Sequence, residues 1–231
     1  MSTLLSVNNL NIEAHTRTGV VQVVKDLSFS IRQGETLGVV GESGCGKTVT
    51  ALSIMKLLPK ETLKISSGNI IFNNKAINNL SDSELEKIRG NEISMIFQEP
   101  MTSLNPLFTV GEQVAEVVRR HRNVNKERAW KRAIELLDLV KIANPEKKAS
   151  DYPFQLSGGQ RQRVMIAVAL ACEPKILIAD EPTTALDVTI QAEILALINR
   201  LKEETGTAVM FITHDMAVVA QMADRVVVMY Q

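Results

Sequence analysis

The sequence predicts an α/β fold: a core built on a mostly parallel sheet, an antiparallel β arm at the N-terminus and an inserted α-helical subdomain. Short runs that are apolar at every position alternate with helical stretches, as expected for a buried parallel sheet. Residues 5–31 instead alternate apolar and polar side chains with little helical period. From about residue 110 to 171 the pattern is helical throughout and interrupts the β/α alternation.

The first part of the chain predicts the arm and the start of the core. Leu5 to Ile12 and Val20 to Ile31 read as two antiparallel strands, with a turn near residues 18–19. Gln33 to Glu35 forms a turn into the apolar run Thr36 to Val40. The elements expected next are a helix over 49–58 that Pro59 stops, a strand over 68–72, a short helix from the capping box Ser81-Asp-Ser-Glu84 to Ile88, and a strand over 93–97.

The second part predicts the helices and the rest of the sheet. Asn125 caps a helix whose core face carries Trp130, Ile134, Leu137 and Val140. A helix from Ser157 to Ala171 and a central strand over 176–179 follow. The next helix, over 188–204, has an apolar core stripe from Ile190 to Leu201, and Gly206 ends this helix. The last expected strands cover 208–212 and 225–230. Because the last strand-like run reaches the final residues, we expect a C-terminal extension beyond it.

Composition limits the classes of function. Lys plus Arg and Asp plus Glu both number 26, so no net basic field indicates a nucleic-acid partner. Two cysteines are too few for a disulfide framework and favour a reducing, cytosolic setting. No apolar run approaches the roughly 18 residues that span a bilayer, and the first residues lack the pattern of a signal peptide. We therefore expect any role at a membrane to work through a docked partner.

The strongest motif is Gly41-Glu-Ser-Gly-Cys-Gly-Lys-Thr48, between a predicted strand and a predicted helix. This spacing is that of a phosphate-binding loop, whose backbone N–H groups surround a polyphosphate at a helix N-terminus. Lys47 would neutralise the β- and γ-phosphates, and the Thr48 hydroxyl would bind Mg²⁺. The predicted nucleotide-binding residues here are Gly41, Glu42, Ser43, Gly44, Cys45, Gly46, Lys47, Thr48 and Thr50.

Other polar groups follow predicted strands or begin helices. Asp180 and Glu181 end the run 176–179; Asp180 would hold Mg²⁺, and Glu181 would either accept a proton from the attacking water or orient it. Gln98 would reach Mg²⁺ or the same water, and His214 would donate a hydrogen bond to the γ-phosphate. Ser157, Gly158, Gly159 and Gln160 form a second glycine-rich turn at a helix start, which is a second anion site.

In this order and spacing the motifs resemble the nucleotide-binding domain of ATP-binding cassette (ABC) proteins, over essentially the whole chain. They are Gly41–Thr48, Gln98, the signature Leu156–Gln160, Asp180-Glu181, the loop 185–187 and His214. The stretches 97–106 and 180–191 look like the ATPase subunits of oligopeptide, dipeptide and nickel importers. The resemblance implies a P-loop NTPase (RecA-like) fold in one domain, with 1–98 and 172–231 as core and arm and about 99–171 as the helical subdomain.

The resemblance also implies an assembly. Two ATPase subunits, identical or related, form a head-to-tail dimer in which Ser157 to Gln160 bind the nucleotide held by the partner and Asp187 lies at the interface. Each turnover closes the dimer on ATP and Mg²⁺ and opens it after hydrolysis. Two polytopic permease subunits, docked against residues 98–106 and the helical subdomain, and an extracytoplasmic solute-binding protein complete an importer. The chain would then lie peripherally on the cytoplasmic face of the inner membrane and import peptides or a related solute, nickel included.

Two positions keep alternatives open. The family stacks adenine on an aromatic residue of the arm, but no Phe, Tyr or Trp precedes Phe29 here; either His15 takes that place or stacking is weak. Cys45 is either a reactive thiol at a helix N-terminus or an inert small residue.

Two other functions fit the sequence less well than the importer. A soluble ABC ATPase acting on DNA or ribosomes would carry a long coiled-coil insertion or tandem cassettes; residues 48–180 leave no room for a coiled coil, and the sequence contains one cassette. A non-hydrolysing regulatory cassette would lack Glu181, His214 or the signature glycines, and all are present.

Overall fold

The structure, a computed structural model, describes residues 2–17, 19–98, 103–183 and 187–230. Contacts divide the chain into two compact units. The first contains residues 1–86 and 208–231, and the second contains residues 87–207. Each unit is described by itself below. The division into a core and a helical subdomain over about 99–171 stays a prediction.

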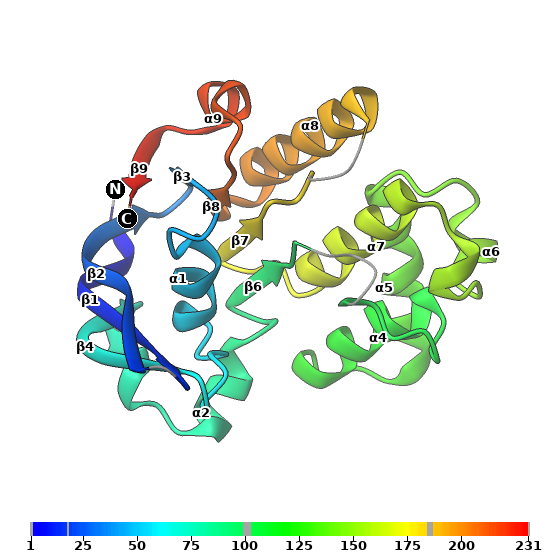
Figure 1. The fold of residues 1–231 in the computed structure, drawn as a ribbon. Helices are drawn as coiled ribbons and strands as arrows, with labels where there is room; N and C mark the ends of the chain where they lie inside the picture. The colour runs from blue at the N-terminus through cyan, green and yellow to red at the C-terminus, as the bar shows by residue number, and fades with distance from the viewer. Residues whose placement is uncertain (1, 18, 99–102, 184–186, 231) are drawn as a thin grey trace. The chain divides into compact units, whose positions relative to one another are not determined.

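The predicted antiparallel arm is confirmed in the first unit. Strands β1 (Thr3–Thr16) and β2 (Gly19–Arg32) pair antiparallel, and β4 (Leu63–Phe72) and β5 (Lys75–Ala76) extend the sheet in the order β2-β1-β4-β5. The two long strands form a twisted ribbon beside helix α1 (Figure 1). Buried apolar residues of β1 alternate with less buried ones, as the pattern predicts, except at a register shift between Val7 and Leu10; the buried residues are Leu5, Val7, Leu10 and Ile12.

Parallel strands make the other sheet layer of the first unit. Strand β3 (Thr36–Gly41) lies between β8 (Ala208–Ile212) and β9 (Arg225–Met229) and pairs in parallel with both. Residues 36–40 and all of β8 are buried, as expected for central strands. Strand β9 is largely exposed, which the apolar sequence of residues 225–230 did not reveal. A 3₁₀ turn (Ile77–Asn79) and the short helix α9 (Met216–Met222) complete this unit.

Helix α1 (Lys47–Ile54) is shorter than predicted and ends at a different signal. The expected end was Leu58, with Pro59 as the stop. Instead Lys56 takes a positive φ of 50°, and the N–H of Leu57 donates to the carbonyl of Leu52 at 2.8 Å. A left-handed residue with such a bond closes a helix, so the chain has already left the helix before the proline.

The second unit contains two short strands and most of the helices. Strands β6 (Ile93–Ile96) and β7 (Ile176–Asp180) pair in parallel and are buried at every residue, which confirms the prediction for 176–179. The helices and turns, with α2 entering from the first unit, are α2 (Asp82–Ile88), α4 (Val110–His121), α5 (Lys126–Leu139), α6 (Pro145–Lys148), a 3₁₀ turn (Pro153–Gln155), α7 (Gly158–Leu170) and α8 (Val188–Thr205).

Capping predictions are confirmed, whereas one core face is wrong in part. The Asn125 side chain accepts from the N–H of Arg128 at 2.9 Å, and Gly206 ends α8 with a φ of 67°. On α5, however, the fully buried positions are Ala129, Ala133, Leu136 and Leu137. Trp130 and Ile134 are half-buried and lie at the border of this face.

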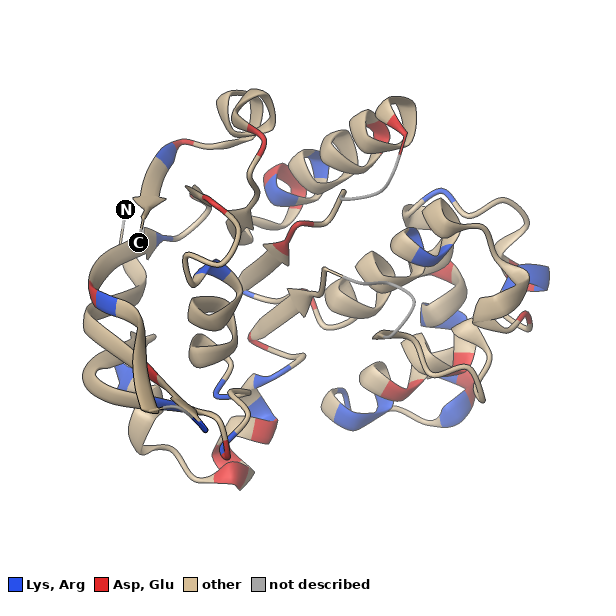
Figure 2. Cartoon of the chain, viewed as in Figure 1, with Lys and Arg blue, Asp and Glu red and all other residues tan. Residues whose placement is uncertain are grey.

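No helix among the described residues is long and apolar enough to cross a membrane. Figure 2 shows basic and acidic residues interspersed on helices α4 to α6 of the second unit. Helix α4 has Glu112 in its first turn and Arg119 and Arg120 in its last turn, which is the order of charges that a helix dipole favours.

Candidate functional site

The predicted phosphate-binding loop connects β3 to α1 and is held tightly from two sides within the first unit. A Cβ at Gly41 would lie 2.2 Å from the carbonyl oxygen of Met229 on β9. A Cβ at Gly46 would lie 2.9 Å from Val24 and 3.0 Å from the carbonyl oxygen of Val23 on β2. Gly46 is also the N-cap of α1, with a φ of 96° that favours glycine. Only glycine therefore fits at these two positions.

Lys47 is the first residue of α1, and its side chain folds back over the loop. Its Nζ donates to the carbonyl oxygens of Gly41 and Glu42, at 2.8 Å each, and only 6% of the residue is exposed. Within the described part of the chain the contacts of this ammonium are two neutral carbonyls and the Cys45 sulfur at 3.8 Å, with no carboxylate. A buried charge that lacks a counter-charge is unfavourable. The loop therefore fits an anionic ligand, as a nucleotide polyphosphate would be.

The remaining loop residues divide into exposed and buried groups. Glu42, Ser43, Gly44 and Thr48 are exposed at the loop surface. Cys45 is 3% exposed, and its sulfur lies 2.6 Å from the position that a Cβ at Gly41 would take. This burial favours the interpretation of Cys45 as an inert small residue over that of a reactive thiol. Thr50 has no exposed surface, and its hydroxyl finds no hydrogen-bond partner among the described residues.

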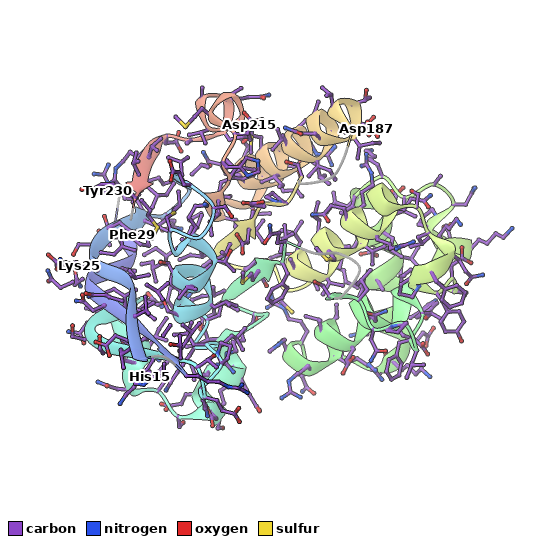
Figure 3. The ribbon with its side chains drawn as sticks, in the orientation of Figure 1. His15, Lys25, Phe29, Asp187, Asp215 and Tyr230 are labelled. Atoms are coloured by element: carbon purple, nitrogen blue, oxygen red, sulfur yellow. The ribbon has the colours of Figure 1, made fainter. Side chains whose placement is uncertain are left out.

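His214 lies at the same edge of the sheet as the loop. Strands β3 and β8 run parallel with Val39 paired to Ile212, so both end at one edge. The N–H of Thr213 donates to the Val39 carbonyl at 3.2 Å, and His214, the next residue, is exposed. Asp215 then caps α9 through its Oδ1, which accepts from the N–H of Ala217 at 2.9 Å (Figure 3).

In the second unit, Gln98 and Glu181 are brought together. Strands β6 and β7 are in register with Ile96 opposite Ala179, so the residues after both strands meet at one edge. There the Gln98 Nε2 donates to Glu181 Oε2 at 3.0 Å. Asp180, the last residue of β7, is 1% exposed, whereas Glu181 is half-buried and has a φ of 45°. The carboxylates of Asp180 and Glu181 and the amide of Gln98 therefore all lie at the ends of β6 and β7.

The signature turn forms a regular helix start. Ser157 is the N-cap of α7: its hydroxyl accepts from the N–H of Gln160 at 3.3 Å, and its own N–H donates to Gln160 Oε1 at 3.0 Å. Gly158 has no atom within 4 Å of the position of a Cβ, whereas a Cβ at Gly159 would lie 3.1 Å from Ile190 of α8. The exposed Ser157 and Gly158 therefore present an open backbone at a helix N-terminus.

Asp187 is exposed and begins α8, where its Oδ1 accepts from the N–H of Ile190 at 2.9 Å (Figure 3). Residues 185 and 186 of the predicted loop 185–187 lie outside the described residues, as do residues 99–102 of the predicted docking stretch 98–106. Among the described His, Cys, Asp and Glu residues there is no group of three that could hold a metal ion. The proposed Mg²⁺ ligands Thr48, Gln98 and Asp180 include only one such residue.

His15 lies near the hairpin end of the arm and is exposed (Figure 3). The loop touches the arm at Val24, whose partner on β1 is Ile12, and His15 is three residues further along the strand. At the usual rise per residue this is about 10 Å along β1. Phe29, the first aromatic residue after it, is buried in the core.

Sequence reasoning missed two buried polar residues of α7. Arg163 is 9% exposed; it forms an ion pair with Glu193 and donates to the Val140 carbonyl at 3.0 Å. Gln162 is 2% exposed and donates to the Pro182 carbonyl. Its position four residues before the apolar Ile166, on one helix face, is the signal that could have identified it.

Comparison with known proteins agrees with this geometry. The family described as ABC transporter matches residues 24–184. The chain is 55% identical over 98% of its length to a probable peptide ABC transporter ATP-binding protein, y4tR, of Sinorhizobium fredii, and 54% identical over its whole length to the dipeptide transport ATP-binding protein DppD of Bacillus subtilis. It spans 68% and 69% of the length of these two relatives, and 63% of the oligopeptide transport protein OppD of Bacillus subtilis.

A solved structure shares the fold. The ATP-binding cassette MJ0796, a dimer in a post-hydrolysis state bound to ADP and Pi, superposes with a TM-score of 0.87 at 34% identity; the match covers 98% of this chain and 94% of that one. Together with the loop geometry, these similarities show that the chain belongs to the ABC transporter family, as one of its ATP-binding ATPase cassettes that work with Mg²⁺.

Proposed function

We propose that this chain is the ATP-hydrolysing subunit of an ABC importer for peptides or a related small solute, nickel included. One observation carries the proposal: the Lys47 ammonium is buried against two backbone carbonyls in a glycine-cradled loop, with no carboxylate beside it in the described chain. The class of solute rests on the relatives, which are named for transport of peptides, dipeptides, oligopeptides and, at 52% identity, glutathione.

Nucleotide binding would use the loop Gly41, Glu42, Ser43, Gly44, Cys45, Gly46, Lys47 and Thr48, with Thr50 supporting it from within α1. Lys47 pairs with the β- and γ-phosphates, and the loop N–H groups donate to their oxygens. His15, about 10 Å along the arm from the loop, would contact adenine. Thr48, Gln98 and Asp180 would hold Mg²⁺, which when bound neutralises charge on the phosphate oxygens.

Hydrolysis would depend on groups at the ends of three strands. Glu181 accepts the proton of the attacking water or orients that water, and Gln98, which donates to Glu181 at 3.0 Å, fixes the carboxylate. His214 donates a hydrogen bond to the γ-phosphate. Lys47 stabilises the charge that develops there.

A second cassette would complete the site. Ser157, Gly158, Gly159 and Gln160 would bind the nucleotide held by the partner, since they present free backbone groups at a helix N-terminus. Asp187 would lie at the interface of the two cassettes. The dimeric cassette with ADP and Pi supports this arrangement. Hydrolysis removes the contact of the signature with the γ-phosphate, and the dimer opens.

The membrane partners would be two permease subunits, with residues 98–106 and the helical segment as their docking surface. Support comes from a structural relative that is described as part of the transporter complex cbiONQ. The chain would then be peripheral on the cytoplasmic face of the inner membrane and receive solute from an extracytoplasmic binding protein. The alternative, a soluble ABC ATPase on nucleic acid or ribosomes, is not favoured by the transport relatives.

The test is to purify the full-length chain with its partners and measure hydrolysis and uptake. We expect polytopic membrane proteins to copurify, peptide-loaded binding protein to stimulate ATP hydrolysis, and Lys47→Ala to abolish nucleotide binding and both activities. Unchanged ATP affinity in Lys47→Ala would contradict the assignment of the loop. Copurification with ribosomes or nucleic acid, and no membrane subunit, would favour the alternative.

A further inference from the structure

Gln162 is a buried polar residue that the proposed function does not use. It lies on α7, five residues after the signature serine, and is 2% exposed. Its side-chain amide donates to the carbonyl oxygen of Pro182, the residue that follows Glu181. One side chain thus connects the signature helix to the turn that carries the proposed catalytic carboxylate, and both lie in the same compact unit.

The turn that Gln162 contacts has an unfavourable backbone. Glu181 has a φ of 45°, in the left-handed region that glycine and asparagine prefer. The following Pro182 also biases Glu181 toward extended conformations. A residue stays in such a conformation only when its surroundings hold it there, and such residues concentrate at functional sites. The contacts around residues 181 and 182 therefore decide where the carboxylate points.

Two side-chain hydrogen bonds, from Gln98 and from Gln162, reach this turn. Gln98 donates to the Glu181 carboxylate itself at 3.0 Å and is exposed. Gln162 donates to the backbone one residue later and is buried. An acceptor that loses its hydrogen bond in a buried site is costly, and among the described residues Gln162 is the side chain that donates to the Pro182 carbonyl. Gln162 is thus the better placed of the two to fix the backbone.

Helix α7 is a firm support for this contact. The next residue, Arg163, forms an ion pair with Glu193 of α8 and donates to the Val140 carbonyl after α5. Near the helix start, Gly159 packs closely against Ile190 of α8. These contacts hold α7 against its neighbours, so the Gln162 side chain is anchored where it meets Pro182, and a displacement of the helix would move Pro182 with it.

We propose that Gln162 is a positioning residue for ATP hydrolysis: it holds the Glu181-Pro182 turn in its left-handed conformation and couples the signature helix to the catalytic carboxylate. This inference rests on the proposed function of Glu181. Gln162 is buried and is not one of the residues proposed to bind nucleotide. Its removal should therefore lower the rate of hydrolysis and leave ATP binding intact.

The test compares two substitutions of similar size in the full-length chain, assembled with its partners. Gln162→Met removes the donor, and kcat should fall about 10- to 100-fold, the range for a buried acceptor left unpaired, with the KM for ATP unchanged. Gln162→Glu supplies a carboxyl that donates to Pro182 only when protonated. Burial favours the neutral form of a carboxyl group. The kcat of Gln162→Glu relative to the parent should therefore decrease as the pH rises.

Two controls separate the possible outcomes. Ile166→Val removes one buried methylene from the same helix face and should lower the Tm while kcat stays at the parental value. An equal loss of kcat in Ile166→Val would show that Gln162 acts only through stability and would overturn the inference. Parental kcat in Gln162→Met, with Glu181→Gln inactive, would also overturn it and leave the proposed function standing. Parental hydrolysis in Glu181→Gln would instead overturn the proposed function.

Discussion

Gly158→Ala separates folding of the chain from the proposed contact with a partner's nucleotide. Nothing lies within 4 Å of a Cβ built at Gly158, and the residue is the first of α7. Alanine is favoured over glycine in a helix, so we expect stability to be unchanged or to rise by about 0.4–1 kcal/mol. The new methyl group would nevertheless stand where the signature backbone meets the γ-phosphate. Loss of one charge-assisted hydrogen bond costs about 1.5–3 kcal/mol, or roughly 10- to 150-fold in turnover.

The assay is steady-state ATP hydrolysis of the assembled transporter together with thermal unfolding of the full-length chain. Gly206→Ala is the matched control, because its Cβ also has nothing within 4 Å. Its left-handed φ of 67° should cost about 1–2 kcal/mol of stability, while hydrolysis stays at the parental rate. If Gly158→Ala hydrolyses ATP at the parental rate, the signature turn does not contact nucleotide and the dimer reasoning fails.

Three further substitutions test other parts of the structure. Glu181→Gln should keep ATP binding and lower hydrolysis by orders of magnitude, measured as single-turnover rate and nucleotide affinity; parental turnover would remove Glu181 from its role. Gly41→Ala should destabilise the chain by about 1–3 kcal/mol in denaturant unfolding and abolish ATP binding, because its methyl would overlap the Met229 carbonyl at 2.2 Å. Burial, and then the charges of Arg120 and Arg122, lower the pKa of His121, so the unfolded chain binds more protons near pH 6.5. Stability should therefore fall as pH drops through 6.5 toward the folded-state pKa, and His121→Gln should flatten that slope in pH-dependent unfolding curves.

The periodic parts of the fold could be predicted from sequence because burial follows local pattern there. The alternation in β1, the apolar runs of β7 and β8, and the caps at Asn125 and Gly206 can each be read from the local sequence. No local sequence signal marks the end of α1. It depends on a left-handed Lys56, a residue type that carries no preference for that conformation, so the later Pro59 was the more visible but wrong signal.

The candidate site was predictable in its residue types but not in its contacts. The spacing of Gly41 to Thr48 identifies the loop, yet not that the arm and β9 close on two of its glycines. Likewise the carboxylate pair at 180–181 gives no sign that Gln98, more than eighty positions earlier, donates to Glu181. These contacts follow from which strands are neighbours, and strand order is set by the tertiary packing of the whole chain.

The division of polar groups between the two units gives the proposed reaction its physical basis. The first unit holds Lys47 and His214, which are proposed to bind or donate to phosphate, and lacks Glu181. The second unit holds Glu181, Gln98 and the signature turn, and lacks the phosphate-binding loop. In the proposed function a ligand with several charged oxygens would contact both sets, and its binding free energy would then favour any arrangement in which they are simultaneously engaged. Cleavage of the terminal phosphate removes part of that binding free energy, so the chemistry itself supplies the signal for release.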